Sequence, residues 1–449
     1  MSSIVVAGDT SGSVTLQAPA IAGSTVISLP ASSMNMGNGG GNVSSNTAFG
    51  SDALASNTTG AFNVAIGQVA MYSNTTGQQN TAIGRYSLNA NQTGQQNTAI
   101  GHSSLQQNTA SYNTAAGAYA LNANTTGSNN TAIGYQALNL NTVGTDNAAL
   151  GLQAGYNTTG SGNTYLGSQA GFGISSGNAN IAIGNLALGG SGITANDNIA
   201  IGNGVLYANT SGTRNTAVGG GTYGGAYPAL RFNTTGSNNT AFGNGALSSN
   251  TTGSNSVAIG YNALNAYNGA NGHVALGYSA GSNLTGGQSG VYLGNGTQGG
   301  STTASNEIAI GINVTGKGTN TAFISANGGG TYNGANSTTW ATTSDQRIKK
   351  NIVPLVGSLD KIVALNPVEF DYKETDKHEI GFIAQEYETV LPDQIILHEP
   401  NEAEKEWVID DQVKAIQQNL TPYLVAAIKE LKLELDAVKA ELATLKGAQ

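Results

Sequence analysis

One glycine recurs at a nearly constant interval through most of this chain, and its period limits the possible folds more than any other feature. The glycine closes the pattern Asn-Thr-Ala-Ile-Gly and stands at positions 50, 67, 84, 101, 117, 134, 151, 167, 184, 202, 219, 243, 260, 277, 294 and 311. Eleven of the fifteen intervals are 17 residues. A fixed period in this range, with one small supersecondary unit per repeat, is typical of a solenoid. The sequence therefore predicts a mainly β fold with a β-solenoid over residues 37–326.

The pattern inside one repeat predicts the shape of a coil. In residues 80–84 the alternation of side chains places Ala82 on one face of a short strand and Ile83 on the other. A second apolar pair follows, as at Tyr86 and Leu88, and predicts a second strand. We therefore expect two short strands and two tight turns in each coil. At about 4.8 Å per coil, sixteen coils would form a rod on the order of 75 Å long.

The tetrapeptide Asn-Thr-Thr-Gly recurs between the apolar segments, for example at residues 74–77. Its glycine is predicted to supply a positive φ, and its asparagine to hydrogen-bond its own turn. The same Asn-Thr-Thr is an N-glycosylation pattern. Because it recurs as a turn and no secretory signal is visible, we expect the turn role.

Small residues dominate the coil interiors, so a single coil would bury little apolar area. Lateral packing of three rods would bury a stripe of Leu and Tyr as well. We predict that this stripe is core or intersubunit surface rather than a sugar-binding ladder. Its leucines include Leu54, Leu88, Leu105, Leu121, Leu138 and Leu247.

The charge density changes abruptly near residue 343. Residues 1–343 contain four Lys or Arg and five Asp or Glu, whereas residues 344–449 contain twelve and twenty. This contrast predicts separate domains: an N-terminal β cap over 1–36, the solenoid over 37–326, a Gly/Thr-rich linker over 327–343 and a last domain over 344–449. The net charge of -9 argues against a nucleic-acid partner. The chain has no cysteine, and its four histidines lack metal-ligand spacing, so no metal or cofactor is expected.

Two motifs stand in the last quarter of the chain. Residues 343–352 read Thr-Ser-Asp-Gln-Arg-Ile-Lys-Lys-Asn-Ile, and residues 381–386 read Gly-Phe-Ile-Ala-Gln-Glu. In this order they resemble the intramolecular chaperone domain of phage tail spikes and fibres, the S74 autopeptidases. The resemblance implies a domain that helps three chains fold and then cuts itself off. It assigns a catalytic pair, Ser344 and Lys349, and a cleavage site between Ser344 and Asp345. The supporting motif residues are Arg347, Asn351, Gly381, Gln385 and Glu386.

The chemistry of the junction can also be argued from the residues. A serine hydroxyl is a poor nucleophile unless a base activates it, and a lysine can act as that base only when its pKa is lowered. Arg347 and Lys350 are like-charged sequence neighbours of Lys349 and would disfavour its protonated form. The alternative is that these three residues form a solvated basic face. With both motifs present, we favour the catalytic pair.

The region after residue 352 has a mixed pattern. It predicts a short helix over 359–365 and strands over 368–372, 379–383 and 407–409. A seam of apolar residues then alternates spacings of four and three, which predicts a coiled-coil helix over 420–447. The residue types in the seam do not predict how many helices the coiled coil contains, and the family resemblance implies three. The seam residues are Leu424, Ile428, Leu431, Leu435, Val438, Leu442 and Leu445.

The largest break in the 17-residue period lies between the glycines at 219 and 243, where 24 residues replace 17. The extra segment combines aromatic residues with an arginine: Tyr223, Tyr227, Arg231 and Phe232. Insertions in a solenoid project from one face and often bind ligands, so this is a possible receptor loop. The alternative is a loop that packs against a neighbouring chain. A glycan hydrolase would need paired carboxylates, and the repeat region has only widely spaced acids, so hydrolase activity is not expected there.

The Ala-Ile-Gly pattern is also similar to the β-roll head of trimeric autotransporter adhesins, a resemblance that implies only the fold. Those adhesins need a secretory signal, and the first nine residues have neither a basic segment nor a long apolar core. No apolar run of about 18 residues predicts a membrane-spanning helix. We therefore give the chaperone resemblance more weight.

Together these patterns predict a trimeric β-solenoid (β-roll) fibre of about 17-residue repeats, followed by a small α+β chaperone domain that ends in a coiled-coil helix. The implied function is that of a phage tail fibre, made in the host cytoplasm and carried on the virion. Residues 1–36 would join other tail proteins, and the fibre would bind a host cell-surface glycan or protein receptor. The alternative is a bacterial or other surface adhesin or structural fibre with the same self-releasing chaperone. We expect a homotrimer, an autoproteolytic peptidase that acts once on its own chain, no turnover enzyme activity in the fibre and no membrane insertion.

Overall fold

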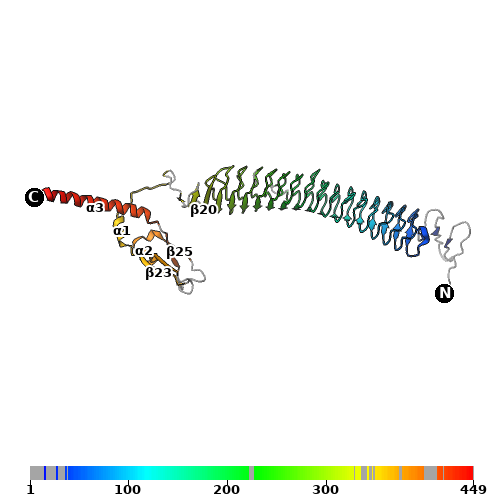
Figure 1. Cartoon of the computed structure of the whole chain (residues 1–449), viewed down its shortest axis with the longest axis horizontal. Coiled ribbons are helices and arrows are strands. Elements are labelled where there is room, and N and C mark those ends of the chain that lie inside the picture. Colours follow the sequence, from blue (N-terminus) through cyan, green and yellow to red (C-terminus); the bar gives the residue numbers. More distant parts are fainter. Residues whose placement is uncertain are drawn as a thin grey trace, which may run out of the picture. The chain divides into compact units, whose positions relative to one another are not determined.

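The structure is a computed structural model of the whole chain (Figure 1). It describes residues 15–16, 27–28, 36–37, 39–221, 227–269, 271–327, 329–334, 341–342, 346, 349–373, 377–398, 412–417 and 419–447. The chain divides into two compact units, Met1–Thr343 and Ser344–Gln449, and each is described by itself. The finer domain boundaries expected at residues 36 and 326 stay predictions.

The first unit is the β-solenoid, with seventeen short parallel strands, β4 to β20, stacked in chain order (Figure 1). The strands of the stack are β4 Thr47–Phe49, β5 Val64–Ile66, β6 Thr81–Ile83, β7 Thr98–Ile100, β8 Thr114–Ala116, β9 Thr131–Ile133, β10 Ala148–Leu150, β11 Thr164–Leu166, β12 Ile181–Ile183, β13 Ile199–Ile201, β14 Thr216–Val218, β15 Thr240–Phe242, β16 Val257–Ile259, β17 Val274–Leu276, β18 Val291–Leu293, β19 Ile308–Gly311 and β20 Thr321–Asn327. Each strand pairs with the next in the same register, one repeat further along the chain. The predicted mainly β solenoid is confirmed.

Short antiparallel pairs flank this stack. At its start β3 (Met36–Gly37) pairs with β4. A 3-10 helix, Gly40–Asn42, lies between these two strands. At its end β20 pairs with β21 (Gly329–Gly334), which pairs with β22 (Ala341–Thr342). Upstream, β1 (Thr15–Leu16) pairs with β2 (Ile27–Ser28), within the segment where a β cap was predicted. Among the described strands β3 pairs only with β4 and β22 only with β21, so the ladder is open at both ends.

Each coil has one strand rather than the two that we expected. The segment after the strand is a series of turns in which alternate residues have positive φ, for example Tyr86 at 59° and Leu88 at 48°. Its backbone still bonds along the stack: Tyr86 N–H donates to Gln68 O (3.1 Å), and Leu88 N–H donates to Ser104 O (2.9 Å). Alternating turns therefore satisfy the coil-to-coil hydrogen bonds without extended geometry.

The repeat glycines have two different structural causes. Gly84, at the end of its strand, has φ of 133°, and a Cβ there would lie 2.5 Å from Gly101 O. Gly77, in the Asn-Thr-Thr-Gly turn, does not have a positive φ, so our expectation for that glycine was wrong. It is needed because a Cβ would lie 2.5 Å from Gly94 O in the next coil. Asn74 Nδ2 does donate to Gly77 O (3.1 Å), as predicted for the asparagine of the turn.

The core of the solenoid consists of a column of Ala from the strands and a column of Leu from the turns. All six leucines singled out from the sequence are fully buried within the single chain, so they are core. Burying a leucine contributes roughly 1.5–3 kcal/mol, whereas the left-handed backbone of a residue such as Leu88 costs about 1–2 kcal/mol. Folding of a single coil would therefore gain little free energy, and contacts between stacked coils must supply the stability.

Two ladders of buried asparagine run along the interior of the stack. One precedes the strands: Asn80 N–H donates to Asn63 Oδ1 (3.0 Å), and Asn80 Nδ2 donates to Gly94 O (2.9 Å). The other joins the turns, where Asn91 Nδ2 donates to Asn74 Oδ1 (2.9 Å). Because each side chain bonds to an adjacent coil, the ladders favour an in-register stack and satisfy polar groups away from water.

Near the end of the stack the strand-preceding ladder changes its residues. Its column continues after Asn239 with Ser256, His273, Gly290 and Glu307. The buried Glu307 carboxylate accepts hydrogen bonds from the Tyr292 hydroxyl (3.1 Å) and from the N–H of Gly318 (2.6 Å) and Gly300 (3.1 Å). These donors offset the cost of removing a carboxylate from water. Burial, and then the neighbouring Glu307 carboxylate, raises the pKa of Tyr292.

The second unit is a small α+β arrangement (Figure 1). Its elements are α1 Ser358–Ala364, β23 Val368–Asp371, β24 His378–Gly381, α2 Ala384–Val390, the 3-10 helix Pro392–Gln394, β25 Ile395–His398, β26 Val413–Ile416 and α3 Thr421–Gly447. β23 pairs antiparallel with β24, and β25 with β26. The helix expected over 359–365 and the strands over 368–372 and 379–383 are confirmed to within two residues. The strand expected over 407–409 lies outside the described residues.

The long helix α3 confirms the helix predicted over 420–447. Its heptad seam contributes nothing to the core of the single chain, because the seven seam side chains are between 43% and 66% exposed. The opposite side of its first turns packs against α1 and the chain that precedes α1. An apolar seam of this length normally faces another helix.

Candidate functional site

The junction motif is described only in part. Ser344, Asp345 and Arg347 lie outside the described residues, so the geometry of the catalytic pair and of the bond to be cut stays a prediction. Lys349 and Asn351 are exposed, and Lys349 N–H donates to Gln346 O (3.1 Å), which closes a turn inside the motif. Asn351 has φ of 53°, a left-handed conformation that asparagine tolerates better than most residues.

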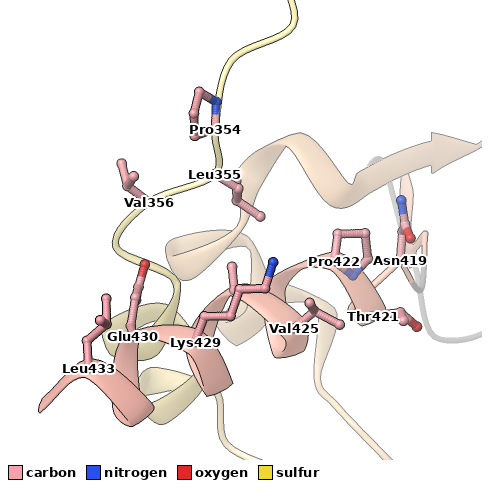
Figure 2. Close-up of a pocket in the computed structure, with 11 residues that line it drawn as sticks. Pro354, Leu355, Val356, Asn419, Thr421, Pro422, Val425, Lys429, Glu430 and Leu433 are labelled. Atoms are coloured by element: carbon pink, nitrogen blue, oxygen red, sulfur yellow. The ribbon is translucent and has the colours of Figure 1, made fainter. Parts of the chain in front are cut away.

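The chain that follows the motif lies along α3. Residues 352–356 read Ile-Val-Pro-Leu-Val, and their apolar side chains are exposed, Val353 at 79%. Residues 354–356 form one wall of a groove of about 690 Å³, and residues 421–433 of α3 form the other (Figure 2). Most of the exposed lining is apolar, from side chains such as Leu355, Val425 and Leu433. The segment leaving the proposed cleavage site is thus placed against the helix that carries the heptad seam.

Glu430 of α3 anchors the end of this segment. Its carboxylate accepts hydrogen bonds from the backbone N–H of Leu359 (2.7 Å) and Ser358 (3.2 Å), the first residues of α1. The N-cap residue of α1 is Gly357, which has no side chain to cap the helix, so Glu430 supplies the missing acceptor. These N–H donors lower the pKa of Glu430. The sequence pattern did not reveal this role, because Glu430 looks like any acidic residue on a solvent-facing helix.

The second motif surrounds a different cavity. Gly381 ends β24, and Gln385 and Glu386 lie in the first turn of α2, a helix that the sequence analysis missed. Gly381 and Gln385 line a cleft of about 580 Å³ together with Phe370 and Lys414, among others. A Cβ at Gly381 would lie 3.2 Å from the Phe370 ring, which explains the glycine.

The remaining motif residue, Glu386, joins α2 to the turn between α1 and β23 and does not line this cleft. Its Oε2 accepts a hydrogen bond from Asn366 Nδ2 (3.1 Å), in the turn between α1 and β23. Lys349 and Asn351 line neither the cleft nor the groove on α3. The structure therefore brings Gly381 and Gln385 together, but not with the described residues of the junction motif.

The insertion in the solenoid gathers three of its four predicted residues. The rings of Tyr227 and Phe232 lie 5.1 Å apart, and the Arg231 guanidinium lies 5.8 Å from the Phe232 ring centre. Tyr223 lies outside the described residues. Tyr207, from the preceding coil, also contacts Arg231 (5.2 Å), and the sequence analysis missed it because the two residues are 24 apart.

The described residues hold no group of three or more His, Cys, Asp or Glu placed to bind a metal ion. None of the helices in the described part of the chain is both long and apolar enough to span a bilayer.

Comparison with known proteins bears on the C-terminal unit. A family model described as "Chaperone of endosialidase", a peptidase S74 model, matches residues 344–396. No curated protein and no solved structure matches the chain. The matched span begins at Ser344 and includes the junction motif and residues 381–386. The C-terminal unit therefore carries an S74-type intramolecular chaperone region, on a chain whose other unit is a β-solenoid.

Proposed function

We propose that this chain is a phage tail fibre that assembles as a homotrimer and whose C-terminal unit, residues 344–449, assists folding and then releases itself. The observation that carries the proposal is the S74 chaperone match directly after a long β-solenoid. A solenoid of near-identical coils has many possible misregistered pairings, and its contacts between chains are non-local and slow to form. A helper that gathers three chains first would remove this ambiguity.

Exposed apolar surface supports assembly in both units. On the solenoid the third residue of most strands points outward, and Ile83, Ile133 and Leu276 are 37%, 41% and 49% exposed. Such a stripe continues from coil to coil, and the largest contiguous apolar patches on monomeric proteins are typically only a few hundred Å². On α3 the heptad seam is exposed in the same way. Three copies packed around one axis would cover both surfaces.

Release would follow hydrolysis of the peptide bond between Ser344 and Asp345, which consumes one water molecule. Ser344 supplies the hydroxyl of the catalytic pair and Lys349 the base. The groove on α3 supports this assignment, because it places the segment after the motif against the helix that would gather the three chains (Figure 2). Loss of the helper after folding would leave the mature fibre kinetically stable.

Intact and native mass spectrometry of the purified protein tests the proposal. The wild-type chain should appear as two pieces that end and begin at Ser344 and Asp345, with the larger piece trimeric. Ser344→Ala and Lys349→Ala should stay full-length and still form trimers. Lys373→Ala is the matched control, since it removes an exposed lysine outside the junction motif, and it should still be cut. A wild-type chain that remains intact after folding contradicts self-release.

The adhesive role is tested on particles and cells. Finding the protein on purified virions supports the tail-fibre assignment, whereas finding it only on a bacterial surface supports the alternative adhesin. Receptor binding is assigned to the insertion that contains Tyr227, Arg231 and Phe232, with Tyr223 as its fourth residue. Deleting residues 220–226 and changing Tyr227, Arg231 and Phe232 to Ser should abolish adsorption to the host and leave the trimer intact. Unchanged adsorption would remove the role from this loop.

A further inference from the structure

The insertion is an addition to one corner of one coil, not a distortion of the core. In a regular coil the corner after the strand closes in three residues, as where Ala246 N–H donates to Gly243 O (3.2 Å). In the coil with the insertion, the same closure is made by Ala229 N–H and Gly219 O (2.9 Å). The coil then resumes, with Leu230 fully buried. The coil would be complete without the insertion. The exposed side chains that gather beside it therefore need another explanation.

Beside the insertion a cation lies between aromatic rings, in a group that we call the insertion cluster: Tyr207, Tyr227, Arg231 and Phe232. Arg231 and Phe232 belong to the resumed coil, and Tyr227 directly precedes it. The Arg231 guanidinium lies 5.2 Å from the Tyr207 ring centre and 5.8 Å from that of Phe232. Tyr227 packs edge-to-face on Phe232, and these two side chains are 55% and 39% exposed. The rings of two coils and the insertion thus meet around one guanidinium.

The guanidinium is held by packing rather than by polar partners. Among the described residues Arg231 forms no ion pair, and its side chain donates no hydrogen bond. The neighbouring Gly204 leaves room for it, because a Cβ there would lie 3.0 Å from Arg231 Nη1. Residues 1–343 contain only four basic residues, so this is a rare positive charge on a nearly uncharged surface. Its forked N–H donors are therefore available to an anion from outside.

We infer that the insertion cluster binds an acidic saccharide, with Arg231 pairing with a sugar carboxylate and the exposed rings of Tyr227 and Phe232 packing on the C–H face of a sugar ring. A guanidinium matches a carboxylate with two parallel hydrogen bonds. Tyrosine combines a flat apolar surface with a polar tip, which suits a ligand that is apolar on its ring face and polar at its edge. This inference rests on the proposed adhesive function and names the chemical class of its receptor.

A peptide ligand fits the cluster less well. Peptides commonly bind by adding a strand to a sheet edge, and here the neighbouring backbone already bonds within the stack: Ala208 N–H donates to Arg231 O (3.0 Å), and Gly245 N–H donates to Tyr227 O (2.8 Å). The described side chains of the cluster offer ring faces and one charge. A flat, charged ring matches that surface.

Binding of oligogalacturonate to the full-length protein, measured by calorimetry at low salt, tests the inference. Methyl-esterified oligogalacturonate is the matched neutral probe, because it keeps the sugar backbone and loses the charge. The wild type should bind the acid form and not the ester. Arg231→Gln should weaken binding roughly 10-fold or more, the size expected for hydrogen bonds to a charged group. Arg214→Gln, which removes a solenoid arginine outside the cluster, should bind like the wild type.

Two further variants test whether binding needs a ring of the insertion cluster or whether any exposed tyrosine would do. Tyr227→Ala should weaken binding, whereas Tyr112→Ala, which removes an equally exposed tyrosine from another coil, should not (both are 55% exposed). Equal binding of acid and ester, no binding of the acid form, or an Arg231→Gln variant that binds like the wild type would overturn the inference. Failure of the proposed function is distinguishable, since it would appear in native mass spectrometry of the same samples as a chain that is neither cut nor trimeric.

Discussion

The solenoid and the C-terminal unit differ in where they keep their apolar side chains. In the solenoid the Ala and Leu columns are fully buried within one chain, and buried asparagines satisfy each other along the stack. In the C-terminal unit the buried apolar residues among those described are only Tyr387, Leu391 and Ala427, whereas Val353 and Val363 are 79% and 76% exposed. One unit has a complete core along its own axis, and the other does not.

This difference indicates what each unit contributes. A solenoid coil gains stability from the coils before and after it, so a single chain can already satisfy its interior. The C-terminal unit leaves an apolar seam, an apolar segment and a groove uncovered. Such surface is costly in water and suits a unit that works when several chains meet. The contrast is what a fibre with a separate folding helper requires.

Removing the C-terminal unit should have the largest effect on assembly. A chain that ends at Thr343 should fail to form the fibre trimer. Its coils are nearly identical, so nothing else would set the register of three copies. Native mass spectrometry and resistance of the trimer to heat on gels measure the outcome. Ser344→Ala, which keeps the helper attached, is the control and should form trimers. If the chain ending at Thr343 yields the same heat-resistant trimer, the C-terminal unit is not a folding helper.

A single charge in the seam of α3 should have the next largest effect. Leu435→Lys would place a cation between three helices, where burial of an unpaired charge costs several kcal/mol. We expect most trimer to be lost in analytical ultracentrifugation of the uncut protein. Ala440→Lys introduces the same side chain on the face of α3 opposite the seam and should leave assembly unchanged. Normal assembly of Leu435→Lys would mean that the exposed seam does not join the chains.

A core leucine tests the solenoid side of the comparison. Leu138 is fully buried and its N–H donates to Ala154 O (2.9 Å), whereas Leu140, two residues on, is 42% exposed. Leu138→Ala should destabilise its coil by about 2–5 kcal/mol, and Leu140→Ala by less than about 0.5 kcal/mol if no other copy covers it. Amide hydrogen exchange in the flanking coils measures both changes. Similar exchange in the two variants would contradict a core that closes within one chain.

The smallest expected effect is a pH dependence at the end of the asparagine ladder. His273 Nδ1 accepts a hydrogen bond from Gly290 N–H (2.8 Å), and the ring lies between those of Tyr267 (4.7 Å) and Tyr292 (5.8 Å), with Glu307 bonded to Tyr292. Burial lowers the pKa of His273 from its ordinary value of 6.5. The unfolded chain therefore binds a proton more readily, so stability is complete above about pH 6.5 and falls as the pH drops below it.

Thermal unfolding at a series of pH values measures this effect. His273→Asn places asparagine in the column that asparagine occupies in earlier coils, and it should reduce the loss of stability between about pH 6.5 and 5. His102→Asn changes a histidine that lies on the outer surface between Tyr86 and Tyr119, and it should leave the profile unchanged. An identical pH profile for His273→Asn and the wild type would show that the buried imidazole does not set it.

Much of the architecture could be predicted because it depends on local pattern. The glycine period predicted sixteen coils, one fewer than the seventeen stacked strands, because β20 lacks the repeat glycine. The leucine column was predicted as core or intersubunit surface and is core. The 3–4 spacing after residue 420 marked α3. The turns were harder: apolar alternation at Tyr86 and Leu88 is the same for a strand and for a run of alternating positive-φ residues, so the second strand was wrongly predicted. The role of Gly77 was misjudged for a related reason, because a Cβ there would meet both Asn74 of its own turn and Gly94 of the next coil, and the latter contact exists only once coils stack.

The sequence by itself determined that the chain repeats, that its charge divides at residue 343 and that its last part carries the S74 motifs. The tertiary structure decided which distant residues meet: Glu430 with the start of α1, Gly381 with Phe370, and Tyr207 with Arg231. The physical reason is that a repeat period and a motif are set along the chain, whereas these contacts depend on how coils stack and helices pack. The spacing of these residues along the chain does not predict that they are in contact.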